Sequence, residues 1–227
     1  MLFRSILAGG EPIDILRRVV FSLVAVLITV TVHELAHAFT AYKCGDPTAK
    51  NMGLLTLNPM KHANPIGIII LLLFGFGWIS PLYMNIRNFK KPKLGIALTA
   101  ASGSAMNLLI GFILMIFAAA MEFVLIFKGE NHIVLNIYEL FQTIAIYNIS
   151  YAVFNLIPFP PLDGSAIVSS FLPPKYQVKY LALEKYFTFF LIGLIIVSQV
   201  IDILSIITTM IYLGFRTVIF KLIGLFL

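Results

Sequence analysis

The sequence predicts an all-α polytopic membrane protein of four to six transmembrane helices, with a short strand-containing, re-entrant segment on the cytoplasmic side. Of its 227 residues, 60% are hydrophobic and 11% are charged, and the mean hydropathy is +0.98. A soluble domain usually carries about 25% charged residues, so this composition excludes an ordinary globular protein. The single cysteine, Cys44, excludes a disulfide-stapled module. The length predicts one transmembrane domain over residues 1–227.

Apolar runs and turn residues divide the chain into its predicted elements. The first run predicts a spanning helix over 19–42, close to the ~20 residues that a crossing needs. A segment rich in Gly and Pro follows over 43–93, with a candidate strand at Leu54–Leu57. Its apolar run at Ile66–Trp78 has a length that suits a re-entrant or interfacial segment better than a span. The remaining elements are helices over 94–127 and 137–157, a loop over 158–164, and C-terminal helices over 181–227, of which 181–201 is a span.

The strongest functional pattern lies inside the first predicted helix, where His33, Glu34 and His37 form a His-Glu-x-x-His motif. Residues at i and i+4 share a helix face, so both imidazoles can reach one metal ion. Glu34 is placed to act on water at that ion without being a ligand. A three-letter match can arise by chance in a soluble protein. Within a membrane helix, however, each ionisable residue costs on the order of 2–3 kcal/mol, so three together indicate a metal site.

A catalytic zinc ion usually has three protein ligands, so a third must come from another part of the chain. Asp163 is the best candidate among the acidic residues near apolar segments, because Pro158, Pro160 and Pro161 precede it. Irregular backbone of this kind survives at membrane depth only where it is buried in protein or lines a cavity. The other acidic residues are more typical of interfaces and loops; they are Glu122, Glu139, Glu184 and Asp202.

These two stretches together resemble the site-2 protease family of intramembrane zinc metalloproteases, in its short form without PDZ or CBS domains. The resemblance rests on the motif of residues 33–37, on residues 155–164 ending in Leu-Asp-Gly, and on residues 103–107, where Ser104 replaces a proline. Residues 45–50 and 55–62 add further similarity. It implies one zinc ion per chain held by His33, His37 and Asp163, with Glu34 as catalytic acid and base. It also favours a role for Asn155 in orienting substrate or stabilising an oxyanion.

The remaining polar residues are first interpreted as structural. His62 and His132 are expected in loops, where water satisfies an imidazole. Asn107 and Asn148 are expected to bridge helices by hydrogen bonds, the usual role of amides in a membrane bundle.

Charge alone does not decide the topology of the chain. Whether Ile66–Tyr83 spans or re-enters, ten Lys and Arg residues are expected on the cytoplasmic face and four on the outer face. A shared metal does decide it, because a spanning Ile66–Tyr83 would place the end of the first helix and Asp163 about 30 Å apart on opposite faces. We therefore expect a re-entrant segment 66–78 within a cytoplasmic cap over 43–93, and an active site toward the cytoplasm.

The function expected from these observations is an intramembrane zinc endopeptidase in the cell membrane, acting on transmembrane segments of protein substrates within the lipid bilayer. A net charge of +6 suits anionic lipid headgroups and does not indicate nucleic acid. One alternative is a metal or ion transporter, which would need polar residues along a whole pathway. The other alternative is an inactive, protease-like scaffold.

Overall fold

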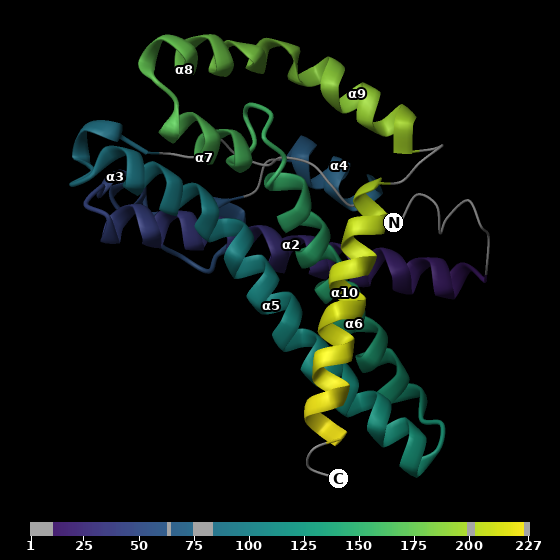
Figure 1. Cartoon of the computed structure of the whole chain (residues 1–227). Helices are drawn as coiled ribbons and strands as arrows, with labels where there is room; N and C mark the ends of the chain where they lie inside the picture. Colours follow the sequence, from purple (N-terminus) through teal and green to yellow (C-terminus); the bar gives the residue numbers. More distant parts are fainter. Residues whose placement is uncertain (1–10, 63–64, 75–83, 199–202, 225–227) are drawn as a thin grey trace.

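The computed structural model describes residues 11–62, 65–74, 84–198 and 203–224, and within these ranges all regular structure is helical (Figure 1). The long helices are α2 (Pro12–Lys43), α5 (Pro92–Lys128), α6 (His132–Asn155) and α10 (Ile203–Gly224). The short elements are α3 (Thr48–Asn51), η1 (Pro59–Lys61), α4 (Pro65–Phe74), η2 (Ile86–Asn88), α7 (Asp163–Phe171), α8 (Pro174–Leu181), η3 (Ala182–Tyr186) and α9 (Phe187–Ser198).

The strand predicted at Leu54–Leu57 is wrong, because these residues form bends between α3 and η1. Local hydrogen bonds explain the difference. The Thr56 hydroxyl accepts from the Asn58 amide at 3.1 Å, and the Asn58 side chain accepts from the Met60 amide at 3.0 Å. Such bonds offer the backbone an alternative to strand pairing.

The core of the bundle is the antiparallel pair α5 and α6, which pack more extensively than any other two elements, with α2 crossing both (Figure 1). Small side chains on one face of α5 permit this close approach. At Gly111, for example, an added Cβ would lie 3.1 Å from Ile149 of α6. The buried face repeats every three or four residues through Ala97, Ala100, Ser104, Asn107, Gly111, Met115 and Ala118.

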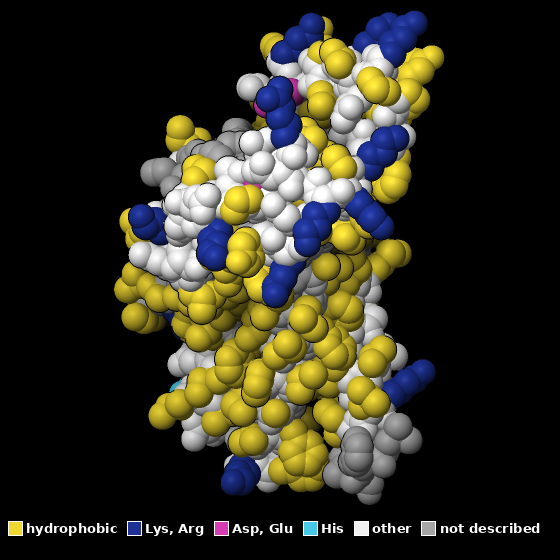
Figure 2. Space-filling model, turned by 90° about the vertical axis from the view of Figure 1, so that its left-hand side faces the viewer, with side chains coloured by type: hydrophobic (Ala, Val, Ile, Leu, Met, Phe, Trp, Pro, Cys, Tyr) yellow, Lys and Arg dark blue, Asp and Glu magenta, His cyan; other side chains and the backbone are white. Residues whose placement is uncertain are grey.

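Three of the described helices, α2, α5 and α10, are long and apolar enough to cross a membrane. Figure 2 shows a broad apolar surface, with Lys and Arg side chains gathered mostly above it. These candidate spans indicate a multi-pass membrane protein. A crossing by α6, which covers most of 137–157, stays a prediction. The described part of the predicted span 181–201 is helical, because η3 continues directly into α9, and its last residues lie outside the described ones, so this crossing also stays a prediction.

The two ends of the segment between α2 and α5 lie side by side. The Lys90 amide donates to the Cys44 carbonyl at 3.2 Å. The buried Asp46 carboxylate accepts hydrogen bonds from the Asn85 amide at 2.6 Å and from the Asn88 side chain at 2.8 Å. Burial raises the pKa of Asp46, but its hydrogen bonds, including those from Thr48, outweigh burial and lower the pKa below its usual value. The chain therefore returns to the point at which it left α2.

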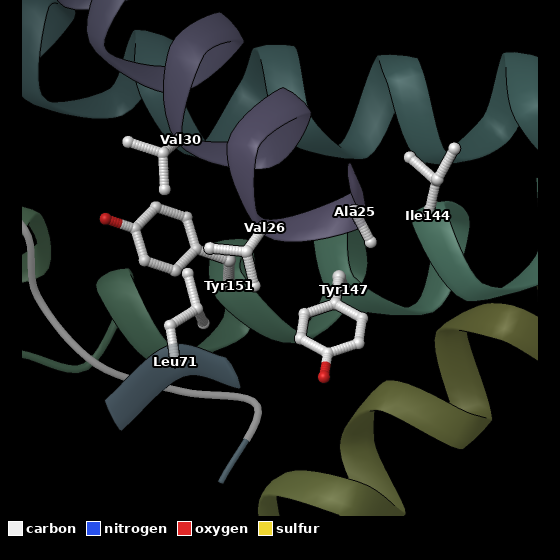
Figure 3. Packing of buried hydrophobic residues seen from close by; sticks show 7 residues of the cluster. All are labelled: Ala25, Val26, Val30, Leu71, Ile144, Tyr147 and Tyr151. Carbon is white, nitrogen blue, oxygen red and sulfur yellow. The ribbon is translucent and has the colours of Figure 1, made fainter. Parts of the chain in front are cut away.

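Helix α4 packs into the surface formed by α2 and α6 (Figure 3). Leu71 is fully buried there between Val26 and Tyr151, and the Tyr147 hydroxyl donates to the Leu72 carbonyl at 3.0 Å. This bond satisfies one of the carbonyls that the end of a helix leaves without a partner. The glycines expected to follow this apolar run, Gly75 and Gly77, lie outside the described residues.

Candidate metal centre

His33 and His37 lie one turn apart on the buried face of α2, as their spacing predicts. Their Nε2 atoms are 2.9 Å apart, and the two rings stand nearly perpendicular at 89°. Both side chains are buried, so the pair faces the interior of the bundle and not lipid.

The structure brings Asp163 to the same point from a part of the chain 126 or more residues away. Its Oδ2 atom lies 3.0 Å from His33 Nε2 and 3.2 Å from His37 Nε2. Asp163 is the first residue of α7, which begins directly against the end of α6. Gly164 permits this approach, because an added Cβ would collide with the Leu156 carbonyl. Potential ligand atoms of the three residues all lie within 4.8 Å of one another.

Both imidazoles are oriented through their Nδ1 atoms. His37 Nδ1 lies 2.6 Å from the Thr99 carbonyl, and His33 Nδ1 lies 2.9 Å from Asn107 Oδ1. A carbonyl can only accept, so the neutral His37 ring carries its proton on Nδ1 and presents a bare Nε2 lone pair to the cluster. Such bonds to the second ring nitrogen are usual for histidines that bind metals.

The donor atoms fit a zinc ion. Asp163 Oδ2 is buried and has no hydrogen-bond partner among the described residues, although two imidazole nitrogens face it. Electron-rich atoms gathered in this way repel one another unless a cation lies between them. Gly103 leaves space beside them, since a Cβ there would lie 2.5 Å from His37 Nε2. Two imidazoles and one carboxylate are a donor set typical of catalytic zinc.

Glu34 is half-buried and lies beside the cluster. Its carboxylate interacts electrostatically with His37, His33 and Asp163, and also with His62. It is therefore near the three candidate ligands without belonging to the group that could hold a metal.

Asn155, the last residue of α6, is also buried. Its amide donates to the Tyr151 carbonyl of its own helix at 3.0 Å, so this contact does not direct it toward substrate. Among the other acidic residues, Glu122 pairs with Arg216 at 2.8 Å and Glu139 lies 3.5 Å from Arg17. Glu184 is exposed, and Asp202 lies outside the described residues.

His62 differs from its expectation as a solvated loop residue, because it is buried and its Nε2 lies 3.0 Å from the Thr56 carbonyl. His132 is exposed, as expected. The sequence did not point to Tyr151, whose ring packs edge-on against His33 at 4.8 Å between centroids. Nor did it point to the Thr99 carbonyl, which no side-chain pattern can signal. The sequence signal that was available for α5, which carries Thr99, was the motif that contains Gly103 and Asn107.

Comparisons with known proteins agree with this site. The profile of peptidase family M50 matches residues 21–126 and 119–198. YwhC of Bacillus subtilis is 39% identical over 171 residues, which cover 73% of this chain and 75% of YwhC. Rip2 of Mycolicibacterium smegmatis is 26% identical over 182 residues, covering 78% of this chain and 66% of Rip2. Rip2 of Mycobacterium tuberculosis strain Erdman is 28% identical over 156 residues, which cover 66% of this chain and 57% of that Rip2.

The chain thus spans three quarters of YwhC and about two thirds or less of Rip2. The names of YwhC and Rip2 assign both proteins, by inference, as zinc metalloproteases. No solved structure matches the chain with statistical significance. The profile match covers most of the sequence, and the YwhC match is both long and well above chance. The chain therefore belongs to peptidase family M50, the site-2 protease family of zinc metalloproteases.

Proposed function

We propose that this protein is an intramembrane zinc endopeptidase that hydrolyses peptide bonds in or near transmembrane segments of membrane-protein substrates. The observation that carries the proposal is the convergence of His33, His37 and Asp163, with Glu34 beside them, inside a bundle of candidate spans. In this proposal His33, His37 and Asp163 hold one zinc ion. When bound, zinc supplies Lewis acidity that polarises the scissile carbonyl and lowers the pKa of water toward ~7.

The chain's own residues perform the proton transfers. Glu34 accepts a proton from the attacking water, and then delivers it to the amide nitrogen as the C–N bond breaks. The products are a carboxylic acid and an amine, so atoms and charge balance. Burial of the site strengthens the electrostatic interactions among these groups, because little bulk water screens them. Asn155 is proposed to orient substrate while it keeps its bond to the Tyr151 carbonyl, because its NH₂ group carries a second hydrogen.

Glu34→Gln tests the chemistry, because the amide keeps the shape of the side chain but accepts no proton. Zinc content should stay at about one per chain, while cleavage of a reconstituted transmembrane substrate should fall by ~10²–10⁴-fold or more. A transporter would show altered metal flux with no proteolysis in either protein, and a scaffold would show no cleavage at all. Equal cleavage by wild type and Glu34→Gln would rule out the mechanism.

The proposed topology places the active site on the cytoplasmic side, with the segment between α2 and α5 re-entrant. It is supported by the contact between Lys90 and Cys44, because a segment whose ends touch must leave and return on one face. Re-entry places ten Lys and Arg residues on the same membrane face as Lys43, and an excess of cations is typical of the cytoplasmic face. They are Lys43, Lys50, Lys61, Arg87, Lys90, Lys91, Lys93, Lys175, Lys179 and Lys185.

Cysteine labelling in sealed vesicles tests this topology. In a Cys44→Ser background, single cysteines at the exposed positions Asn51 and Arg87 should react with a membrane-impermeant reagent from the same face. A cysteine at Asn131, exposed between α5 and α6, should react from the opposite face and serves as the control. Labelling of Asn51 and Arg87 from opposite faces would contradict re-entry.

A further inference from the structure

We propose that Asn107 and Asn148 are positioning residues that fix the proton and the orientation of His33, so that its Nε2 lone pair faces the zinc site. The inference rests on the proposed zinc site and adds to it two residues that touch neither metal nor substrate. It adds to the expectation that these amides bridge helices by hydrogen bonds, which their contacts with each other and with Thr29 confirm.

The residues form one buried chain of hydrogen bonds across three helices. His33 and Thr29 lie one turn apart on α2, Asn107 lies on α5 and Asn148 lies on α6. Asn107 Oδ1 is 2.9 Å from His33 Nδ1, and Asn107 Nδ2 donates to the Thr29 carbonyl at 3.1 Å and to Asn148 Oδ1 at 3.0 Å. Asn148 Nδ2 donates to the Thr29 hydroxyl and to the Ile144 carbonyl, both at 2.9 Å.

The direction of this chain is set by its backbone ends. The Ile144 carbonyl can only accept, so the end of Asn148 that faces it must be the NH₂ group, and Asn148 turns its oxygen toward Asn107. The Thr29 carbonyl fixes Asn107 in the same way, leaving Asn107 Oδ1 toward His33. An oxygen acceptor at 2.9 Å requires a proton on His33 Nδ1. In the neutral ring, Nε2 is then unprotonated and points toward Asp163 at 3.0 Å.

Burial makes the arrangement costly to reverse. Thr29, Asn107 and Asn148 are 0% exposed and His33 is 2% exposed, so water cannot replace a lost partner. A flipped amide would set NH₂ groups against His33 Nδ1–H and leave a carbonyl oxygen facing another oxygen. An amide that served only to join helices would not need a hydrogen bond to His33, a candidate metal ligand. Outer partners of this kind typically change metal affinity by 10–100-fold.

Zinc affinity of the purified protein, measured by chelator competition, tests the proposal without relying on activity. Asn107→Leu keeps the volume but removes the acceptor, and should weaken zinc binding by ~10–100-fold. In Asn107→Asp, a carboxylic acid supplies an acceptor for His33 Nδ1–H and an O–H donor for the Thr29 carbonyl, so its zinc affinity should recover most of that loss. Asn148→Leu should have a smaller effect than Asn107→Leu, because Asn107 keeps its bond to the Thr29 carbonyl.

Ser104→Ala is the matched control. Ser104 is buried one turn from Asn107 on α5 and also bonds to α6, through the Ala152 carbonyl at 3.3 Å, so this bond does not involve either histidine. Its zinc affinity should equal that of wild type, even if thermal unfolding of the metal-free protein shows some loss of stability. A purely structural role predicts instead that all four variants lose stability and that zinc affinity of the folded protein is unchanged.

Wild-type zinc affinity in Asn107→Leu, or an Asn107→Asp affinity as low as that of Asn107→Leu, would overturn the role of Asn107. If Asn107→Leu does not fold, Asn148→Leu and Asn107→Asp decide. Weakened zinc binding by Asn148→Leu together with near-wild-type zinc binding by Asn107→Asp supports the proposal. Any other pair of results overturns it. Failure of wild type itself to bind zinc would refute the metal site, which is a separate result.

Discussion

The candidate ligands reach one point from two differently built regions. His33 and His37 lie in the middle of the bundle, where each ring donates a hydrogen bond through Nδ1, His33 to the Asn107 side-chain oxygen and His37 to the Thr99 carbonyl, and these bonds orient both rings. Asp163 follows a turn with three prolines, and apolar packing holds this turn in place. Phe159 stacks on Phe190 at 4.3 Å between centroids, and Leu162 is buried among Phe154, Phe187, Leu191 and Leu204.

The difference lies in what each kind of contact can specify. Hydrogen bonds are directional, so the histidine region fixes which atom of each ring faces the site. Apolar packing depends on contact area and not on direction, so the aspartate region fixes where the carboxyl group lies more strongly than how it is turned. Consistent with this contrast, Asp163 Oδ2 is the ligand candidate without a hydrogen-bond partner among the described residues.

The largest expected effect comes from removing a ligand from each region. His33→Ala and Asp163→Ala should both reduce zinc binding by more than the ~10–100-fold expected for outer partners. Their metal-free proteins should differ. His33→Ala leaves the buried Asn107 oxygen unpaired, which costs about 1–3 kcal/mol, whereas Asp163→Ala removes a buried carboxylate whose Oδ2 atom has no hydrogen-bond partner among the described residues.

Thermal unfolding in the presence of chelator measures this difference. We expect a lower midpoint for His33→Ala than for wild type, and a midpoint for Asp163→Ala that is equal or higher. Full zinc retention by Asp163→Ala would remove it from the ligand set. An equal loss of metal-free stability in both variants would show that the two regions are built alike.

A smaller effect is expected from loosening the packing around the proline turn. Phe190→Ala removes the ring stacked on Phe159, so the position of Asp163 should become less defined. Zinc affinity should fall by less than ~10-fold, below the effect of losing a directional partner. Phe189→Ala is the control, because Phe189 is the neighbouring residue of α9 and is 72% exposed. Equal affinities in these two variants would show that the packing does not position Asp163.

The two regions also differ in how far the sequence predicted them. The spacing of His33 and His37 was sufficient, since a helix of any context places i and i+4 on one face. Asp163 was predicted from its prolines and from family resemblance. Their meeting depends on the packing of α7 against α5 and on the close approach at Gly164, which no local pattern contains.

Elsewhere, the sequence failed where side-chain hydrogen bonds or burial decide the local structure. The strand at Leu54–Leu57 had suitable residues but no described partner strand, and local bonds at Thr56 and Asn58 shaped the backbone instead. His62 was assigned to solvent because a loop position carries no signal of burial.

The smallest effect tests a hydrogen bond that joins the proline turn to α8. The Tyr180 hydroxyl donates to the Pro158 carbonyl at 2.7 Å, near the surface of the protein. Tyr180→Phe removes only this bond, so stability should fall by about 0.5–1 kcal/mol and zinc affinity should change by less than ~2-fold. Tyr176→Phe, an exposed residue of the same helix, is the control and should leave the unfolding midpoint unchanged. If Tyr180→Phe instead weakened zinc binding as much as Asn107→Leu, a directional bond would be holding the aspartate region as well, and the contrast between the two regions would be lost.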